Sequence, residues 1–591
     1  MAIGSISGQS RQLRFAWNAV RRRIAFRLHG SLLYRWRYAG AIPERLLIAP
    51  IDLRTADPTV ALDIYAGRFV FSGDGIDADG LSVFDAEPPS EDWSRQLHGF
   101  GWLRHLRATD MALSRSNARS LVDEWIKVGN RHDPIAWEPE VVARRIISWL
   151  AQAPLVLEGC DLAFYRRFMR SITRQARHLR RTAYDAPPGL PRLHAMIALA
   201  AVSLSMADQA RFQKQAAKWL DLELVRQILP DGGHISRNPG VILDVLMDLL
   251  PLRQAFASRG GQPSRILLSA VDRMMPMLRF FRQGDGSFAH FNGLGDTPTD
   301  QLATVLAYDD VRGQIPQAAP HSGYQRIEHG GTIILVDAGR PPPVEYSTNA
   351  HAGCLSFEMS SGRQRVIINC GVPAPTAYSM RRLSRTTAAH STVTLNDTSS
   401  CRFLTRSWLA ESVGEPIVTG PSRIDIDRRS ENGATVLSLR HNGYADRYGI
   451  LHERRIALAE GGDRVEGQDS FRTPSGNPVT RAGRDAFVIR FHLHPNVRAS
   501  RSEGGRNVLL ELPDGERWEF HCDGLEVDLE ESILFSNLRG GSRRTDQIVI
   551  HGRCQQNPSV AWQMQRTAVG GNSRRRAAPA LEPPRLSSLR T

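Results

Sequence analysis

A short turn, Asp-Gly-Gly-His at 231–234, contains a residue well suited to acid–base chemistry. A histidine in such a turn between helices is usually exposed to a cleft, and imidazole titrates near neutral pH. His234 is therefore a candidate functional group, with a turn-filling role as an equal alternative. Arg192 and Arg237, in the same region, could clamp a carboxylate through paired N–H groups. A solvated surface arginine is the main alternative, because only three of the 75 basic residues are lysine.

A second candidate is a pair of histidines on one predicted strand. The period of two in a strand places His492 and His494 of Arg-Phe-His-Leu-His-Pro (490–495) on the same face. Two imidazoles so placed could bind a metal, and a buried pair bonded to the backbone is the alternative. The six cysteines are far apart and include no Cys-x-x-Cys pair, which disfavours a zinc ribbon or a disulfide-stapled module.

The elements that must position these residues change in type along the chain. Apolar residues first recur at helical spacing in the blocks 117–128, 139–153, 161–179, 191–206, 208–228, 239–257 and 265–281. Beyond Tyr324 the β-rich runs are 332–337, 354–359, 365–369, 391–396, 487–494, 508–512 and 547–550. The order predicts antiparallel helical hairpins followed by a large antiparallel β-sandwich.

The positive charge lies mainly at the two ends. The formal net charge is +14, of which positions 1–45 carry +8 and positions 574–591 carry +4, so residues 46–573 are nearly neutral. In the first segment Leu13, Trp17, Val20, Ile24 and Leu28 recur at helical spacing among arginines. This pattern predicts a basic amphipathic helix that can lie on an anionic membrane surface, with packing on its own domain as the alternative. The sequence shows neither a signal peptide nor a membrane-spanning run.

Four segments are expected from these changes in pattern. They are a basic amphipathic N-terminal segment (1–45), a helical domain (46–320), a β-sandwich domain (321–567) and a disordered basic tail (568–591).

One region carries a recognisable family pattern. The segments Asn-Ala-His-Ala-Gly-Cys-Leu-Ser-Phe-Glu-Met (349–359), Asn-Cys-Gly (369–371) and Arg-Thr-Thr-Ala-Ala-His-Ser-Thr-Val-Thr-Leu-Asn (385–396) resemble the core of the heparinase II/III C-terminal domain. With the helical region included, the resemblance covers most of positions 90–565. It implies an α+β multidomain protein in which an incomplete (α/α) toroid of helical hairpins precedes a large antiparallel β-sandwich. An anionic polysaccharide would lie in the cleft between the two parts.

The resemblance also implies a reaction, β-elimination of a uronic acid glycoside. Such a lyase must neutralise the carboxylate, present a base to the weakly acidic proton α to it, and protonate the leaving oxygen.

The family's metal and catalytic positions are only partly kept in the β-domain. His351 and His390 match histidines that can hold a structural zinc with an aspartate. Here that aspartate position is Asn369, and a second family aspartate is Gly353, so a zinc site and a metal-free His–Asn network remain alternatives. The family's catalytic histidine is Asn349, which can bind a carboxylate but cannot shuttle protons near neutral pH.

The helical half departs further from the family. Segment 231–241 resembles a family turn whose closing tyrosine, the implied acid or base, aligns with Val241 and whose histidine aligns with Ile242. The family's Asn-His carboxylate neutraliser falls near Leu190 and Pro191.

We therefore hypothesise a rearranged site, which consists of the following residues. The candidate catalytic residues are His234, Asn349, Tyr346 and His351; the candidate substrate-binding residues are Arg192, Arg237, Asn238, His290 and Asn292; the candidate metal ligands are His351, Asn369 and His390. Core or loop packing is the alternative for Tyr346, His290 and Asn292.

Two functions from different classes fit the sequence. The first is a heparinase II/III-like lyase that cleaves an acidic, uronic-acid-containing polysaccharide, requires no cofactor other than an optional structural zinc, and works in the cell envelope or periplasm. The second is a catalytically altered or inactive polysaccharide-binding or cell-envelope protein on the same fold. A cytoplasmic location is the alternative in the absence of a visible signal peptide, and no nucleic-acid partner is expected.

Overall fold

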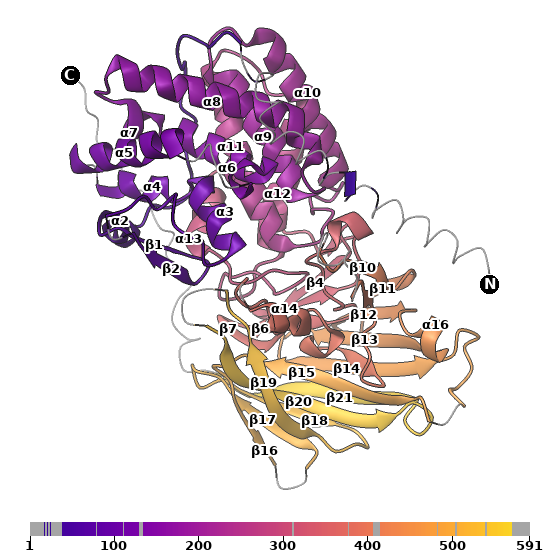
Figure 1. Ribbon diagram of the computed structural model, residues 1–591. Coiled ribbons are helices and arrows are strands. Elements are labelled where there is room, and N and C mark those ends of the chain that lie inside the picture. The colour runs from indigo at the N-terminus through magenta and orange to yellow at the C-terminus, as the bar shows by residue number, and fades with distance from the viewer. Residues whose placement is uncertain are drawn as a thin grey trace.

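The chain folds into a helical half followed by a β-rich half (Figure 1). The computed structural model describes residues 40–569 except 79, 110–111, 129–133, 310–312, 376, 406–413, 481–482, 503–504 and 538–540, together with Trp17, Val20, Arg21, Ile24 and Tyr38. Most of the predicted N-terminal segment and nearly all of the predicted tail lie outside the described residues.

The helical half contains all seven helices that apolar spacing predicts. They are α5 (Ala112–Val128), α6 (Pro139–Ala151), α8 (Leu162–Thr182), α9 (Leu190–Ser205), α10 (Ala210–Gln227), α11 (Pro239–Ser258) and α12 (Arg265–Phe280). Shorter elements complete it: α2 (Pro58–Tyr65), α3 (Glu91–Gly99), α4 (Leu103–Leu106), α7 (Ala153–Leu157), α13 (Thr299–Leu306) and the hairpin of β1 (Arg68–Phe71) with β2 (Asp74–Asp77).

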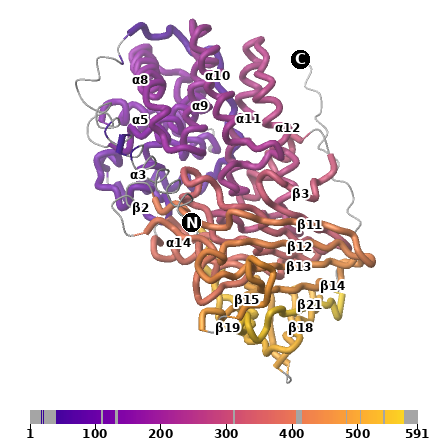
Figure 2. The backbone as a smooth tube through the Cα atoms, turned by 90° about the vertical axis from the view of Figure 1, so that its right-hand side faces the viewer, coloured from indigo at the N-terminus to yellow at the C-terminus, as the bar shows by residue number. Residues whose placement is uncertain are grey.

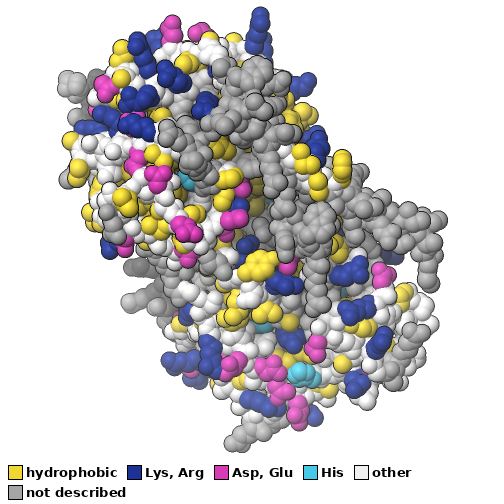
Figure 3. All heavy atoms as spheres, viewed as in Figure 1, with side chains coloured by type: hydrophobic (Ala, Val, Ile, Leu, Met, Phe, Trp, Pro, Cys, Tyr) yellow, Lys and Arg dark blue, Asp and Glu magenta, His cyan; other side chains and the backbone are white. Residues whose placement is uncertain are grey.

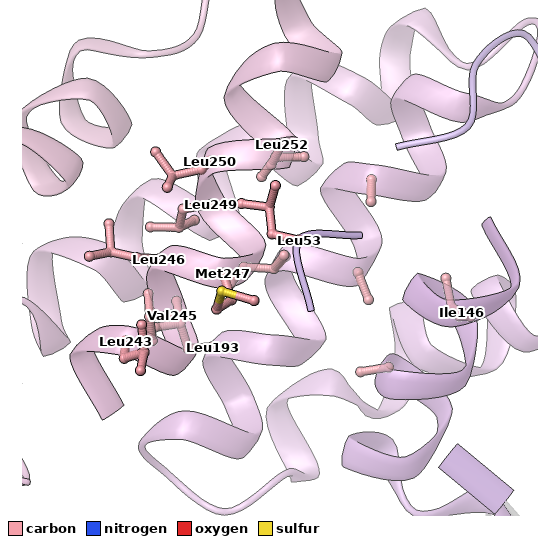
Figure 4. Close-up of a cluster of buried hydrophobic side chains, with 14 of the residues drawn as sticks. Leu53, Ile146, Leu193, Leu243, Val245, Leu246, Met247, Leu249, Leu250 and Leu252 are labelled. Atoms are coloured by element: carbon pink, nitrogen blue, oxygen red, sulfur yellow. The ribbon is translucent and has the colours of Figure 1, made fainter. Parts of the chain in front are cut away.

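Capping residues fix where the main helices begin. The Asp161 carboxylate accepts the backbone N–H of Phe164 at 2.6 Å at the start of α8. The Asn238 side chain accepts the N–H of Gly240 at 2.8 Å at the start of α11, where Pro239 occupies the first turn. Helix α9 is buried along most of its length, between α6, α10 and α11. Leu193, Leu246 and Ile146 belong to the shared core (Figure 4).

The β-rich half consists of two large antiparallel sheets. In one sheet the order is β19-β20-β15-β7-β6-β5-β4-β3, with β8 also paired to β15. Its strands are β3 (Ala318–Ala319), β4 (Tyr324–His329), β5 (Thr332–Asp337), β6 (Phe357–Ser361), β7 (Gln364–Ile368), β8 (Val393–Leu395), β15 (Ala486–Leu493), β19 (Asp528–Leu534) and β20 (Arg543–Arg553).

The second sheet packs on the first. Its order is β11-β12-β13-β14-β21-β18-β17-β16. Its strands are β11 (Ile424–Glu431), β12 (Ala434–His441), β13 (Leu451–Ala459), β14 (Arg464–Arg472), β16 (Arg498–Arg501), β17 (Asn507–Glu511), β18 (Arg517–Cys522) and β21 (Ser559–Ala568). Phe357 of one sheet stacks on Trp562 of the other with ring centroids 5.8 Å apart, and both belong to the core that fills the sandwich. Figure 2 shows the helices standing above the layered strands.

The predicted fold class is confirmed, and each predicted β-run contains a strand. Runs 332–337 and 365–369 correspond to β5 and β7, while run 354–359 begins three residues before β6 because Leu355 has a left-handed backbone (φ 60°). Small elements on the β-half are β9 (Arg402–Phe403), β10 (Ile417–Thr419), α14 (Tyr378–Ser384) and α16 (Ala445–Tyr448). Within the described residues, no helix combines the length and apolar character needed to cross a bilayer.

One buried arginine makes five hydrogen bonds across the junction of the two halves. All five N–H groups of Arg237, in the turn before α11, donate hydrogen bonds: to the carbonyl oxygens of Ser322, Gly323, Gly339 and Arg340, and to Asp337 Oδ1 at 2.5 Å. The guanidinium also lies over the Tyr324 ring, 4.7 Å from its centroid. Arg237 is therefore a junction residue.

Neighbouring residues adapt their backbone to this arginine. Arg237 itself has φ 63°, a left-handed conformation that a bulky side chain rarely adopts. A Cβ on Gly339 would lie 2.2 Å from Nη2 of Arg237, so only glycine fits there. The Tyr324 hydroxyl donates to the Arg237 carbonyl at 2.6 Å, and the Asn292 amide bridges Tyr324 and Asp337.

We predict that Arg237→Met destabilises the protein by about 3–5 kcal/mol, because it leaves the buried Asp337 carboxylate without its cation. Chemical unfolding followed by circular dichroism measures this change. Arg340→Gln is the matched control: its side chain is exposed, and we expect a change within about 0.5 kcal/mol. Equal effects of the two substitutions would contradict the role given to Arg237.

Candidate functional site

The helical half encloses a cleft of about 1400 Å³ that opens toward the β-rich half at Asn537. Residues of α3, α6 and α11 and of strand β1 form its walls. Its charged lining comprises Asp52, Glu91, Asp92, Glu138, Glu140, Asp185, Asp244, Arg54, Arg95, Arg104 and Arg144. Carboxylates thus outnumber guanidiniums, and none of the residues predicted as functional lies among the described lining residues.

Most guanidiniums of the cleft are engaged by its own carboxylates. Asp248, buried behind the wall, binds Arg54 at 2.7 Å and Arg144 at 3.0 Å. Arg95 binds Glu91, Asp92 and Glu138 at 2.8–3.0 Å. These arginines already have anionic partners within the protein.

Two carboxylates of the cleft have no such partner. Among the described residues, Glu140 and Asp244 form neither a hydrogen bond nor an ion pair. Burial raises the pKa of both carboxyl groups above the ordinary range. Hydroxyl or amino groups of a ligand could donate hydrogen bonds to them.

His234 is buried away from the cleft. Its Nε2–H donates to Gln227 Oε1 at 3.0 Å, and its Nδ1 accepts from the Ser236 hydroxyl at 2.7 Å and the Ser236 N–H at 3.1 Å. Burial lowers the pKa of His234 to about 3. Both ring nitrogens are occupied and the side chain is 1% exposed, so the expectation of a histidine facing a cleft is not met; it packs in the turn.

The predicted carboxylate clamp is also absent. All five N–H donors of Arg237 form hydrogen bonds at the domain junction, and the Asn238 side chain caps α11. Arg192 donates to the carbonyl oxygens of Ala186 at 2.9 Å and Tyr184 at 3.3 Å, which ties the preceding loop to α9. These three side chains therefore stabilise turns and the domain junction: carbonyl oxygens accept from Arg237 and from Nη2 of Arg192, and the Asn238 Oδ1 accepts a backbone N–H.

The two predicted metal histidines contact each other directly. His351 Nδ1 and His390 Nε2 are 3.0 Å apart, and His390 Nδ1 bonds the Thr386 carbonyl at 2.7 Å. A Cβ at Gly353 would lie 2.7 Å from the His390 ring, so the imidazole fills the space of the family aspartate. Burial lowers the pKa of His390 to about 4 and that of His351 well below its ordinary value, which keeps both rings neutral.

This donor set does not fit a zinc ion. Asn369 Oδ1 accepts the Ser391 N–H at 3.0 Å, and its amide donates to the His290 carbonyl at 3.3 Å. Among the described residues, no group of three or more His, Cys, Asp or Glu side chains could hold a metal. A protein zinc site needs three or four such ligands, and two imidazoles remain here.

His290 and Asn292 belong to the same buried network. The His290 N–H donates to Glu358 Oε1 at 3.0 Å, and its ring accepts from Arg365 at 3.3 Å. Asn292 accepts the His351 N–H at 3.3 Å. Burial, with Arg365 as a further cause, lowers the pKa of His290 well below its ordinary value. Tertiary structure thus brings the predicted residues together, but as a core network.

Two predicted residues remain accessible near the family's catalytic positions. Tyr346 is half-buried, and a Cβ on Gly189, just before α9, would lie 3.5 Å from its ring. Burial raises the pKa of the Tyr346 phenol. Asn349 is exposed and its Oδ1 accepts from Arg381 at 3.4 Å. The nearby family positions at Leu190 and Val241 have side chains that cannot transfer protons.

Sequence reasoning missed the charged wall of the cleft. Asp244 and Asp248 stand four residues apart in the otherwise apolar run Val-Ile-Leu-Asp-Val-Leu-Met-Asp-Leu-Leu, so they share one helix face. Carboxylates in an apolar helix signal a buried or partnered site, and this signal could have been found. Their partners Arg54 and Arg144 lie on other elements, where no local pattern marks them.

Comparisons with known proteins place this chain in a family. The family model "Heparinase II/III-like, C-terminal" matches residues 312–563. FtsZ-localized protein C of Caulobacter vibrioides (strain NA1000 / CB15N) is 31% identical over 561 residues, which cover 93% of this chain and 96% of that protein. The chain belongs to the heparinase II/III-like family.

Solved structures show the same fold. A crystal structure of heparinase III superposes with a TM-score of 0.68 at 12% identity, over 91% of this chain and 89% of that one. Heparan sulfate lyase HepC from Pedobacter heparinus superposes with a TM-score of 0.59 at 14% identity, over 90% and 87% of the two chains. Both share the helical toroid and the β-sandwich with this heparinase II/III-like protein.

Acid should destabilise this heparinase II/III-like protein through its buried imidazoles. The pKa of His234 is lower in the folded than in the unfolded chain, so its contribution is complete above about pH 6.5 and is lost as the pH falls toward 3. We predict that His234→Gln reduces the loss of unfolding free energy between pH 7 and pH 5 by about 2 kcal/mol. Urea unfolding at both pH values measures it. His321→Gln, which removes an exposed imidazole, should leave the pH dependence unchanged.

Metal removal should leave the fold intact. We predict that dialysis against a strong chelator does not change the melting temperature, because His351 and His390 bond each other and lack further ligands. Elemental analysis of the purified protein should give well below one zinc per chain. A stoichiometric zinc whose removal lowers the melting temperature would contradict this interpretation.

Proposed function

We propose that this chain is a non-catalytic heparinase II/III-like protein that acts together with FtsZ at the cell envelope. The observation that carries the proposal is the state of the histidines: His234, His351 and His390 are buried, neutral and bonded within the protein. None of them can reach a proton on a substrate in the cleft.

The positions of the family's catalytic residues support the same conclusion. Asn349 stands where the catalytic histidine belongs, and Val241 stands where the tyrosine belongs. Neither side chain titrates near neutral pH, so abstraction of the α proton lacks a base. Tyr346 is the remaining candidate, and burial raises the pKa of its phenol, which weakens it as a source of phenolate.

The charge of the cleft argues against an anionic substrate. Glu140 and Asp244 are unpartnered carboxylates among the described residues, while Arg54, Arg95 and Arg144 are engaged by internal carboxylates. A uronic acid chain would meet more negative than positive charge. The association with FtsZ rests on the name of the 31% identical relative, which is aligned over nearly its whole length.

An elimination assay tests the absence of catalysis. We predict no rise in the ultraviolet absorbance of an unsaturated product with alginate, glycosaminoglycans or bacterial exopolysaccharides. Tyr346→Phe should be indistinguishable from the unaltered protein, because Asn349 and Val241, at the family's catalytic positions, cannot exchange a proton with the phenol. Product formation that Tyr346→Phe abolishes would establish a lyase and overturn the proposal.

A localisation experiment tests the association with FtsZ. A fluorescent fusion expressed in its own cells should coincide with FtsZ, and depletion of FtsZ should disperse it. A fusion that keeps its position without FtsZ would contradict this part of the proposal.

A further inference from the structure

Helix α8 presents an unusual concentration of positive charge on the outside of the helical half. Its 21 residues include seven arginines and no acidic residue, although residues 46–573 together are nearly neutral. The arginines are Arg166, Arg167, Arg170, Arg174, Arg177, Arg180 and Arg181, which recur at spacings of three and four and so share one face. Figure 3 shows Lys and Arg side chains gathered over the part of the molecule where α8 lies.

This arrangement weakens the helix itself. Like charges at i and i+4, as at Arg166 and Arg170 or Arg177 and Arg181, destabilise a helix by about 0.2–0.5 kcal/mol per pair. Of the carboxylate ion pairs recorded for the described residues, α8 contributes that of Arg167 with Asp123. Arg166 and Arg170 are exposed and have no partner among the described residues. The exposed charges of Arg166 and Arg170 therefore do not stabilise the fold through any described partner.

Helix α10 extends the same surface. Arg180 of α8 donates to Gln215 of α10 at 2.7 Å and lies 4.8 Å from the centroid of the Phe212 ring, so the two helices are adjacent there. Lys214 and Lys218, two of the chain's three lysines, are exposed one turn apart on α10. Together Arg166, Arg170, Arg180, Lys214 and Lys218 define what we call the α8–α10 basic face.

Exposed apolar side chains continue both rows of cations. Leu162 is 61% exposed and lies one turn before Arg166, on the row that leads to Arg170. On α10, Leu222 (41% exposed) and Val225 (63% exposed) continue the row of Lys214 and Lys218. Cations beside exposed aliphatic groups suit the boundary between lipid headgroups and acyl chains. A nucleic acid would use the cations but not these aliphatic groups.

Tyr38 packs against other residues of α8, which are not members of the α8–α10 basic face. The Tyr38 carbonyl accepts from Arg177 at 3.0 Å, its hydroxyl bonds His178 at 3.2 Å, and Arg181 lies over its ring. Of the predicted N-terminal apolar stripe, Trp17 and Ile24 are helical and 68% and 54% exposed.

We infer that the α8–α10 basic face is a docking surface for an anionic lipid membrane. Guanidinium and ammonium groups bind lipid phosphates, and Leu162, Leu222 and Val225 enter the headgroup boundary. Because the face lies on the outside of the toroid, docking directs one fixed side of the protein toward the lipid. The inference is independent of the proposed function, since it uses no residue of the cleft or of the predicted catalytic set.

Vesicle co-sedimentation of the full chain tests the inference. The unaltered protein should bind vesicles containing phosphatidylglycerol, bind pure phosphatidylcholine vesicles far less, and lose binding as salt rises. The quadruple variant Arg166→Gln, Arg170→Gln, Lys214→Gln, Lys218→Gln should bind at least about tenfold more weakly. Its melting temperature should be unchanged or slightly higher, because like-charge repulsion is relieved.

A matched variant removes the same charge elsewhere. Arg402→Gln, Arg464→Gln, Arg498→Gln, Arg544→Gln alters four exposed arginines of the β-rich half and should leave vesicle binding unchanged. A second variant, Leu222→Ser with Val225→Ser, should weaken vesicle binding without affecting retention on DNA. The inference is overturned if the unaltered chain ignores anionic vesicles, if both quadruple variants bind equally, or if the protein prefers DNA to anionic vesicles at the same salt.

Discussion

The buried guanidinium of Arg237 is the contact on which the arrangement of the two halves depends. It lies in the turn that starts α11, and its five donors reach four carbonyl oxygens and one carboxylate of the β-rich half. A charge so far from water is tolerated because Asp337 and the carbonyl dipoles replace its hydration. The left-handed backbone at Arg237 and the close approach of Gly339 are the local cost of this contact.

His351 and His390, which the sequence suggests as metal ligands, lie in the protein interior. The absence of a side chain at Gly353 leaves room for the His390 ring, which bonds His351. Burial keeps these rings neutral, and neutral imidazoles that share their protons with each other and with the backbone are inert toward a ligand. The carboxylate-rich cleft is consistent with a ligand other than a polyanion.

Charged side chains on the outer surface are paired differently from those of the cleft. In the helical half Arg54 and Arg144 pair with the internal carboxylate of Asp248, whereas Arg166 and Arg170 of α8 have no carboxylate partner among the described residues of the outer surface. Unpaired exposed cations contribute little to folding and much to association with an anionic partner. The net charge of residues 46–573 is nearly zero and so does not reveal this separation. The negative charge of the rest of that region offsets the arginines of α8.

The sequence alone determined the order and type of the elements, since apolar spacing and β-rich runs are local properties of the chain. It also determined the family, because the motifs at 349–359 and 385–396 are contiguous. Only the tertiary structure decided what His234, Arg237 and His390 do, because their roles depend on Gln227, Asp337 and His351, which lie seven to a hundred positions away. Burial is the physical reason: a polar side chain removed from water must bond whatever the fold places beside it. Here the fold places other protein groups beside these side chains, and no local pattern in the sequence predicts which groups they are.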